Sequence, residues 1–140
     1  MTHHISGFIG PEDHLKAQTK DLANAQVIPL AQGMAFLPLG NELYEEIYKF
    51  NHYPMKWLAK KFQPVPIAWI ETDYFGGFGE QSAILWKDGK KRRYRDRFGG
   101  NIDAAMKELG VVCEGDKDEF DTLGLGNHRL NESWLGTEYG

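Results

Sequence analysis

The sequence contains little cysteine, no long hydrophobic run and no excess of basic residues. Its single cysteine, Cys113, cannot close an intramolecular disulfide, which agrees with a reducing compartment. No stretch of about 18 apolar residues is present, so a membrane-spanning helix is not expected. The first ten residues have neither the basic start nor the apolar stretch of a signal peptide. We therefore expect a cytoplasmic protein.

Positive charge is also in short supply, because 16 basic and 20 acidic residues give a formal net charge of −4. This balance disfavours general binding to nucleic acid or to an anionic membrane. The charge is unevenly distributed. Residues 87–97 hold seven bases and two acids, whereas residues 114–140 hold seven acids and two bases. We expect the two segments to be solvated faces that attract each other, or else to be partner-binding patches.

The spacings that identify common catalytic and metal sites are missing as well. The serines lack a G-x-S-x-G elbow, and the five histidines form neither an H-E-x-x-H pair nor a group with a C-x-x-C motif. Gly76, Gly77 and Gly79 lie close together, but a strand pattern follows them instead of the helix that a phosphate-binding loop needs. We expect no metal, no cofactor and a binding protein in preference to an enzyme.

The strand signals indicate an antiparallel meander. Residues 65–73 are β-branched and aromatic with a continuous apolar start, which is typical of a central strand buried on both faces. The glycine-rich residues 74–79 predict a turn, and residues 80–86 predict the returning strand before the Asp88-Gly89 turn. Shorter strands are expected at 5–9, 25–30, 34–39 and 111–113. Pro29 and Pro38 restrict the second and third of these to an edge, or end them there.

Four segments show helical periodicity. They are residues 11–22, 41–49, 54–62 and 101–109, and a further helical turn is expected at 118–123. The 101–109 segment has the clearest pattern, with an apolar i, i+3, i+4, i+7 stripe that begins at Ile102 and a stop at Gly110. These elements predict a single α+β domain over residues 1–140, in which three to four helices pack against a mostly antiparallel sheet.

Candidate functional residues gather around the predicted 74–79 turn. Glu71 and Asp73 share a face of their strand by the two-residue period, and Glu80 lies across the hairpin. Three converging carboxylates could perform acid and base chemistry or hold a hard cation, and otherwise they form a solvated strand end. Phe75 and Phe78 lie in the turn itself, where exposed aromatic rings are suited to binding.

A second interpretation is a small-ligand-binding protein or a hydrolase-type enzyme. Its pocket would gather Glu71, Asp73, Tyr74 and His128, the last of which lies in a polar loop. An apolar pocket with partly buried carboxylates would favour this interpretation, whereas an open acidic ridge would favour a binding module.

Nucleic-acid binding is a third and less favoured interpretation. The basic run includes Arg92, Arg93 and Arg95 around Tyr94, a pattern that could follow a phosphate backbone with one stacking ring. The acidic net charge and the absence of a nucleic-acid fold signature count against this function. A basic strand of this kind could equally pair with an acidic protein surface.

Three segments carry a resemblance to a known group. Residues 69–81 (WIETDYFGGFGEQ), with Gly7-Phe8-Ile9-Gly10 before them and LGLGNHR (123–129) after them, resemble a group of small uncharacterised bacterial proteins. In size, acidity and α+β pattern the chain is also similar to the immunity proteins that neutralise bacterial toxins.

The similarity to immunity proteins implies a module that occludes the active site of a basic toxin domain with acidic and aromatic groups. The implied contacts are Glu71, Asp73, Tyr74, Phe75, Phe78, Glu80, His128 and the acids of residues 114–121. The alternative partner is a second copy of this chain, which would form a homodimer through the tryptophan- and tyrosine-rich surface.

Overall fold

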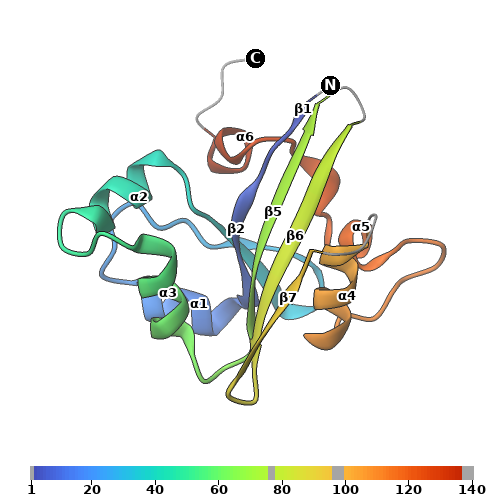
Figure 1. Ribbon diagram of the computed structural model, residues 1–140, viewed down its shortest axis with the longest axis horizontal. Coiled ribbons are helices and arrows are strands. Elements are labelled where there is room, and N and C mark those ends of the chain that lie inside the picture. Colours follow the sequence, from blue (N-terminus) through green and yellow to red (C-terminus); the bar gives the residue numbers. More distant parts are fainter. Residues whose placement is uncertain (1, 76–77, 96–99, 137–140) are drawn as a thin grey trace.

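The computed structural model describes residues 2–75, 78–95 and 100–136, without the side chains of Thr2 and Phe78. Its centre is a sheet in the order β3-β4-β2-β5-β6-β7, and β1 pairs with the far end of β5 (Figure 1). Neighbouring strands in this sheet run antiparallel. The strands are β1 (Thr2–His3), β2 (Ser6–Pro11), β3 (Ile28–Pro29), β4 (Met34–Pro38), β5 (Ile67–Phe75), β6 (Phe78–Lys87) and β7 (Lys90–Tyr94).

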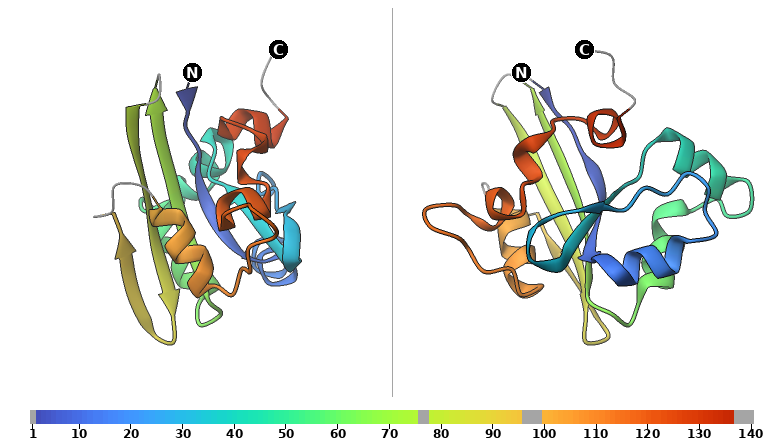
Figure 2. Two further views of the ribbon diagram at one scale, coloured as in Figure 1. Left: turned by 90° about the vertical axis from the view of Figure 1, so that its right-hand side faces the viewer. Right: turned by 180° about the vertical axis from the view of Figure 1, so that it is seen from behind.

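Helices cover both faces of the sheet (Figure 2). The first face lies under α1 (Glu12–Thr19), α2 (Asn41–Tyr48) and α3 (Pro54–Phe62). The second face lies under α4 (Asn101–Glu108), α5 (Glu119–Leu123), the short 3-10 turn η2 (Leu125–Asn127) and α6 (Asn131–Leu135). One further 3-10 turn, η1 (Ala31–Gly33), precedes β4. The prediction of an α+β fold with an antiparallel sheet is confirmed.

The sheet separates two hydrophobic cores, because successive side chains of a strand point to opposite faces. On the first face, the Phe8 ring lies edge-on to Phe62 and Trp69, with ring centroids 5.2 and 5.0 Å apart. On the second face, Ile9 and Ile70 are buried beneath the helices that follow β7. No described helix is long and apolar enough to cross a membrane.

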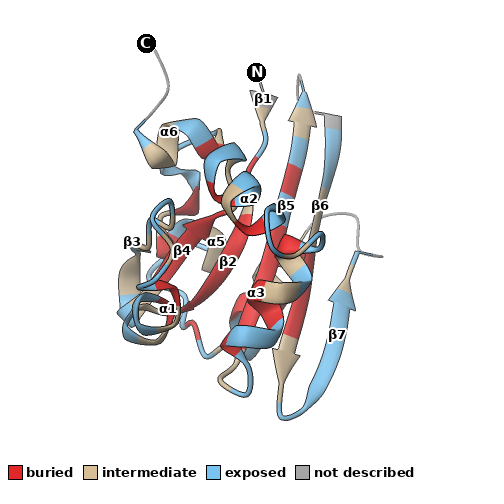
Figure 3. Ribbon diagram, turned by 90° about the vertical axis from the view of Figure 1, so that its left-hand side faces the viewer, coloured by how far each residue is buried: buried red, intermediate tan, exposed pale blue. Residues whose placement is uncertain are grey.

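The β5–β6 hairpin extends past both cores. Its register runs from Ile67 opposite Trp86 to Phe75 opposite Phe78, and β5 is buried on both faces only from Ile67 to Ile70. Beyond that point its first-face residues are exposed, and Figure 3 shows the change from buried to exposed along β5. Gly79 allows the close approach of the two strands, because a Cβ there would overlap the Asp73 carbonyl.

Several boundaries differ from those predicted. The first helix is shorter than residues 11–22, since Pro11 completes β2 and the helix ends at Thr19. Residues 111–113 form no strand. As expected for prolines, Pro29 lies in the edge strand β3 and Pro38 ends β4. The helix α6 had no counterpart among the predictions, because its five residues are too few to show a period.

Candidate functional site

The exposed end of β5 and β6 presents a row of side chains on the first face. Glu71, Asp73 and Phe75 alternate along β5, and Glu80 lies opposite Asp73 on β6. All four are exposed, with 76% exposure for Phe75 and 83% for the Asp73 side chain. We call these four residues the hairpin ridge. As predicted, Glu71 and Asp73 share a face and Glu80 lies across the hairpin from them, and the exposure of the three carboxylates matches an open ridge and not a pocket.

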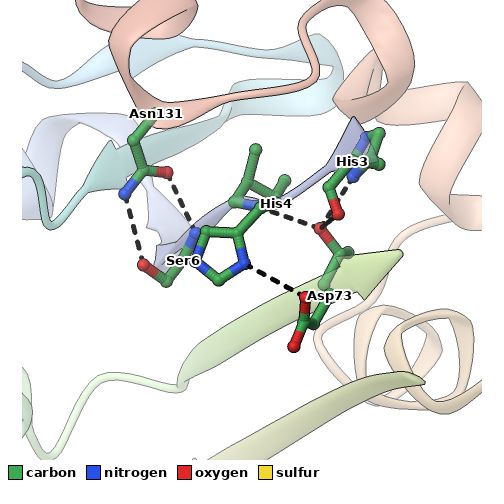
Figure 4. Close-up of polar contacts among 7 residues, drawn as sticks. His3, His4, Ser6, Asp73 and Asn131 are labelled. Carbon is green, nitrogen blue, oxygen red and sulfur yellow. Dashed lines mark hydrogen bonds and ion pairs between the residues drawn. The ribbon is translucent and has the colours of Figure 1, made fainter. Parts of the chain in front are cut away.

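Neighbouring groups contact two carboxylates of the hairpin ridge. The Trp69 indole donates a hydrogen bond to Glu71 Oε1 at 2.9 Å, which holds that carboxylate against the first-face core. His4 Nδ1 lies 3.7 Å from Asp73 Oδ1, and the contact is an ion pair only when the imidazole is protonated (Figure 4).

A shallow groove adjoins the hairpin ridge. It has a volume of about 220 Å³, and Trp69 and Glu71 line it on one side while Arg93 and Arg95 line it on the other. The remaining lining residues are Met55, Ser82, Ala83 and Ile84. The first face thus offers an acidic row, an aromatic ring and a small groove beside one another.

The basic run forms the edge strand β7. Its alternation sends Arg93 to the first face, while Arg92 and Tyr94 point to the second face, so the bases form no single stripe. Tyr94 packs against the second-face core, which leaves it unavailable as a stacking platform. Exposed lysines and arginines on an edge strand discourage pairing with other chains. This arrangement weakens the nucleic-acid interpretation. Arg97 lies outside the described residues.

The residues of the second interpretation do not converge. Tyr74 points to the face opposite Glu71 and Asp73, because it is one residue out of phase on β5. His128 is exposed after η2, and its ring lies edge-on to Trp134 at 4.7 Å. The predicted pocket of these four side chains is therefore wrong. The side chain of Phe78 lies outside the described part of the molecule, as do Gly76 and Gly77.

A cavity instead lies on the second face, beyond the end of the core. It has a volume of about 270 Å³, is open on its outer side, and is bordered by β1, β5 and β6 on one side and by α4 and the start of α5 on the other. We call it the second-face cavity. Its lining residues are His3, Thr72, Tyr74, Gln81, Asp103, Asp118 and Phe120.

His3 reaches this cavity from the first strand. Its Nδ1 lies 2.7 Å from Thr72 Oγ1, which also accepts a hydrogen bond from the Ile5 backbone N–H at 3.0 Å (Figure 4). The other ring nitrogen, Nε2, is buried and has no hydrogen-bond partner among the described residues. Burial, reinforced by the charges of Arg129 and His4, lowers the pKa of His3, so the ring is neutral at neutral pH.

Asp103 is the most perturbed acid of the cavity. Its Oδ1 accepts a hydrogen bond from the Phe120 backbone N–H at 2.8 Å. Burial, together with the neighbouring carboxylates of Asp118 and Glu119, raises the pKa of Asp103 to about 6. Asp118 is the N-cap of α5 and accepts from the Asp121 N–H at 2.9 Å. Two adjacent acids therefore border the cavity, with no lysine or arginine among its lining residues.

A short hydrogen-bond chain orders the remaining wall. Gln81 Nε2 donates to the Tyr74 hydroxyl at 3.3 Å, and Gln81 Oε1 accepts from the Ile102 N–H at the start of α4 at 2.8 Å. The amide thus links β5 to α4 and leaves the Tyr74 hydroxyl hydrogen free to be donated. Among the described residues, no three His, Cys, Asp or Glu side chains are placed to hold a metal ion.

Most residues of the second-face cavity were not predicted. His3 gave no signal, because a histidine close to the start of the chain is usually exposed. One residue could have indicated the cavity from the sequence, namely Thr72. It is polar and lies on the same face of β5 as Ala68 and Ile70 of the second-face core. A polar side chain that is only 2% exposed in such a phase marks a buried hydrogen-bond network.

A separate aromatic surface lies on α2 and on the loop that joins it to α3. Tyr44, Tyr48, Phe50 and Tyr53 are 43 to 67% exposed. The Tyr48 ring stacks on Tyr44 and on His52, with centroids 5.9 and 4.7 Å apart. The tyrosine part of the expected tryptophan- and tyrosine-rich surface therefore exists, whereas the four tryptophans are buried or half-buried.

Comparison with protein-family models, with curated proteins and with solved structures finds no match for this chain.

Proposed function

We propose that this protein is a binding module of the toxin-immunity type, which uses the hairpin ridge to cover the active site of a basic protein domain. The observation that supports this most directly is the single exposed row of Glu71, Asp73 and Phe75, with Glu80 across the hairpin. Exposed carboxylates complement a basic surface and accelerate association with it. An exposed ring among them can act as an anchor that buries apolar area on binding.

The position of the ridge suits the occlusion of an active site. The ladder between β5 and β6 and the pairing of β1 with β5 hold its backbone in place, so little ordering entropy is lost on binding. The groove of about 220 Å³ next to Glu71 can receive one partner side chain. Arg93 and Arg95 border this groove and would restrict which partner charges fit there.

The test is recovery of the untagged protein and of ridge variants from the native cell. The double variant Asp73→Lys, Glu80→Lys reverses two exposed charges, and the double variant Asp21→Lys, Glu108→Lys is the matched control at two exposed acids outside the ridge. We expect the native protein and the control to retain one stoichiometric partner, and the double variant to lose it. Retention by the double variant, or equal loss in the control, would contradict the proposal.

Two further measurements separate the immunity role from other binding. The identified partner should inhibit cell growth when it is expressed alone, and co-expression of this protein should restore growth. The association rate should fall steeply with added salt, because the attraction is between exposed charges.

Sedimentation of the protein alone tests the alternative of a homodimer through the aromatic surface. If that homodimer forms, Tyr48→Ala and Tyr53→Ala should each lower the sedimenting mass.

A further inference from the structure

We propose that the second-face cavity binds a small organic cation, namely an ammonium or guanidinium compound with a flat apolar body. This inference is independent of the hairpin ridge, which lies on the opposite face of the sheet. Two features support it: the carboxylates of Asp103 and Asp118 border one cavity, and aromatic rings from three different segments line the same space.

The carboxylates give the cavity a negative charge that no lining residue neutralises. One oxygen of each carboxylate accepts a backbone N–H of the α5 start, from Phe120 for Asp103 and from Asp121 for Asp118. The second oxygens can accept hydrogen bonds from a ligand, because a carboxylate has room for several donors. Burial, together with the neighbouring carboxylates of Asp118 and Glu119, raises the pKa of Asp103, because both disfavour its charged form. A bound cation would stabilise that charged form.

The rings determine which kind of cation fits. His3, Tyr74 and Phe120 line the cavity, and the His3 and Phe120 ring centroids are 5.8 Å apart. Aromatic faces attract organic cations and provide apolar contact for the rest of the molecule. A volume of about 270 Å³ lies just below the range of roughly 300–1,000 Å³ typical of ligand pockets, which limits the ligand to a small molecule.

His3 has one ring nitrogen that is not hydrogen-bonded. Nε2 is buried and has no hydrogen-bond partner among the described residues, although Nδ1 of the same ring is held by Thr72. Buried polar atoms are usually paired. Because Nε2 has almost no accessible surface, a ligand in the cavity contacts it only if the His3 ring turns. A metal ion would need a larger set of oxygen or nitrogen ligands than the described residues place together.

Titration followed by NMR tests the proposal with benzylammonium as the probe. Benzyl alcohol and benzoate are the controls, because they keep the ring and replace the positive charge by a neutral or a negative group. We expect saturable shifts of His3, Tyr74 and Phe120 resonances with benzylammonium, and binding of the two controls weaker by about tenfold or more. Equal binding of benzyl alcohol or benzoate, or no saturable shift with benzylammonium, would overturn the proposal.

Two conservative variants localise the site. Asp103→Asn keeps an acceptor for the Phe120 N–H, and Asp118→Asn keeps a good N-cap, so both should fold. Each should weaken benzylammonium binding by about tenfold, because each removes a charge-assisted hydrogen bond. Asp116→Asn removes the same charge from an exposed acid outside the cavity and should leave the affinity unchanged. A loss as large in Asp116→Asn would mean that only net charge matters and would reject the site.

Discussion

His3 Nδ1 and Thr72 Oγ1 lie 2.7 Å apart although 69 residues separate them in the chain. Thr72 Oγ1 also accepts a hydrogen bond from the Ile5 N–H. Together the two contacts hold the first strand against β5 and form one wall of the second-face cavity. The same pairing brings His4 alongside Asp73 on the other face. One buried hydroxyl thus organises both candidate sites.

Replacing that hydroxyl should destabilise the fold. Thr72→Val preserves the shape but leaves the buried Ile5 N–H without its acceptor, so we expect a loss of about 1–3 kcal/mol in the free energy of unfolding. Thr72→Ser keeps the oxygen and should lose less. Urea unfolding of the two variants measures the difference. A Thr72→Val midpoint equal to that of the native protein would show that the contact contributes nothing.

Stability should depend on pH through Asp103. Its pKa is raised from 3.8 to about 6 on folding, so the folded protein binds the proton more tightly than the unfolded chain does. The stability contributed by this group is therefore present at low pH and declines as pH rises through the interval between those values. Asp103→Asn removes the decline. Relative to the native protein, this variant should gain thermal stability between about pH 4 and pH 7, whereas Asp116→Asn should follow the native curve.

The exposed ridge could be predicted from the sequence, but the cavity could not. The hairpin and the shared face of Glu71 and Asp73 follow from local alternation along one strand, which a sequence displays directly. The cavity needs His3, Thr72, Asp103 and Asp118, which come from four elements that meet only after folding. Asp103 is a polar residue inside a helix with a clear apolar stripe, and nothing local distinguishes it from a solvated position.

Gly7 should not tolerate a side chain. It lies in β2 between Pro38 and Ile70, and a Cβ at this position would overlap the Leu37 carbonyl and approach the Phe36 ring at 2.6 Å. We expect Gly7→Ala to lower the free energy of unfolding by about 1–3 kcal/mol, because the strands must separate to admit the methyl group.

A matched substitution separates this steric effect from the general cost of replacing glycine. An added Cβ at Gly126 would meet its nearest atoms at 3.4 and 3.8 Å, which are ordinary contact distances. Gly126→Ala should therefore stay within about 0.5 kcal/mol of the native protein in chemical denaturation. Equal losses in the two variants would mean that the approach of β4 to β2 is not the cause.

Asn131 joins the last helix to the sheet through both ends of its amide. Its Oδ1 accepts the Ser6 N–H at 2.9 Å and its Nδ2 donates to the Ser6 hydroxyl at 3.2 Å (Figure 4). The Nδ2 group also donates to the Leu39 carbonyl at 3.4 Å. Asn131→Ala should cost about 1–3 kcal/mol, because the partly buried Ser6 N–H loses its acceptor. Asn131→Asp restores the acceptor but removes both donors and places a charge at a position that is 9% exposed.

These two substitutions distinguish the roles of the amide. If the donated hydrogen bonds and the absence of charge matter as much as the acceptor, Asn131→Asp should be at least as unstable as Asn131→Ala at neutral pH. It should recover part of the loss in acid, where the introduced carboxyl becomes neutral and can donate a hydrogen bond. Thermal unfolding of both variants at about pH 4 and pH 7 makes the comparison. Full stability of Asn131→Asp at neutral pH would show that only the bond to Ser6 N–H holds α6 on the sheet.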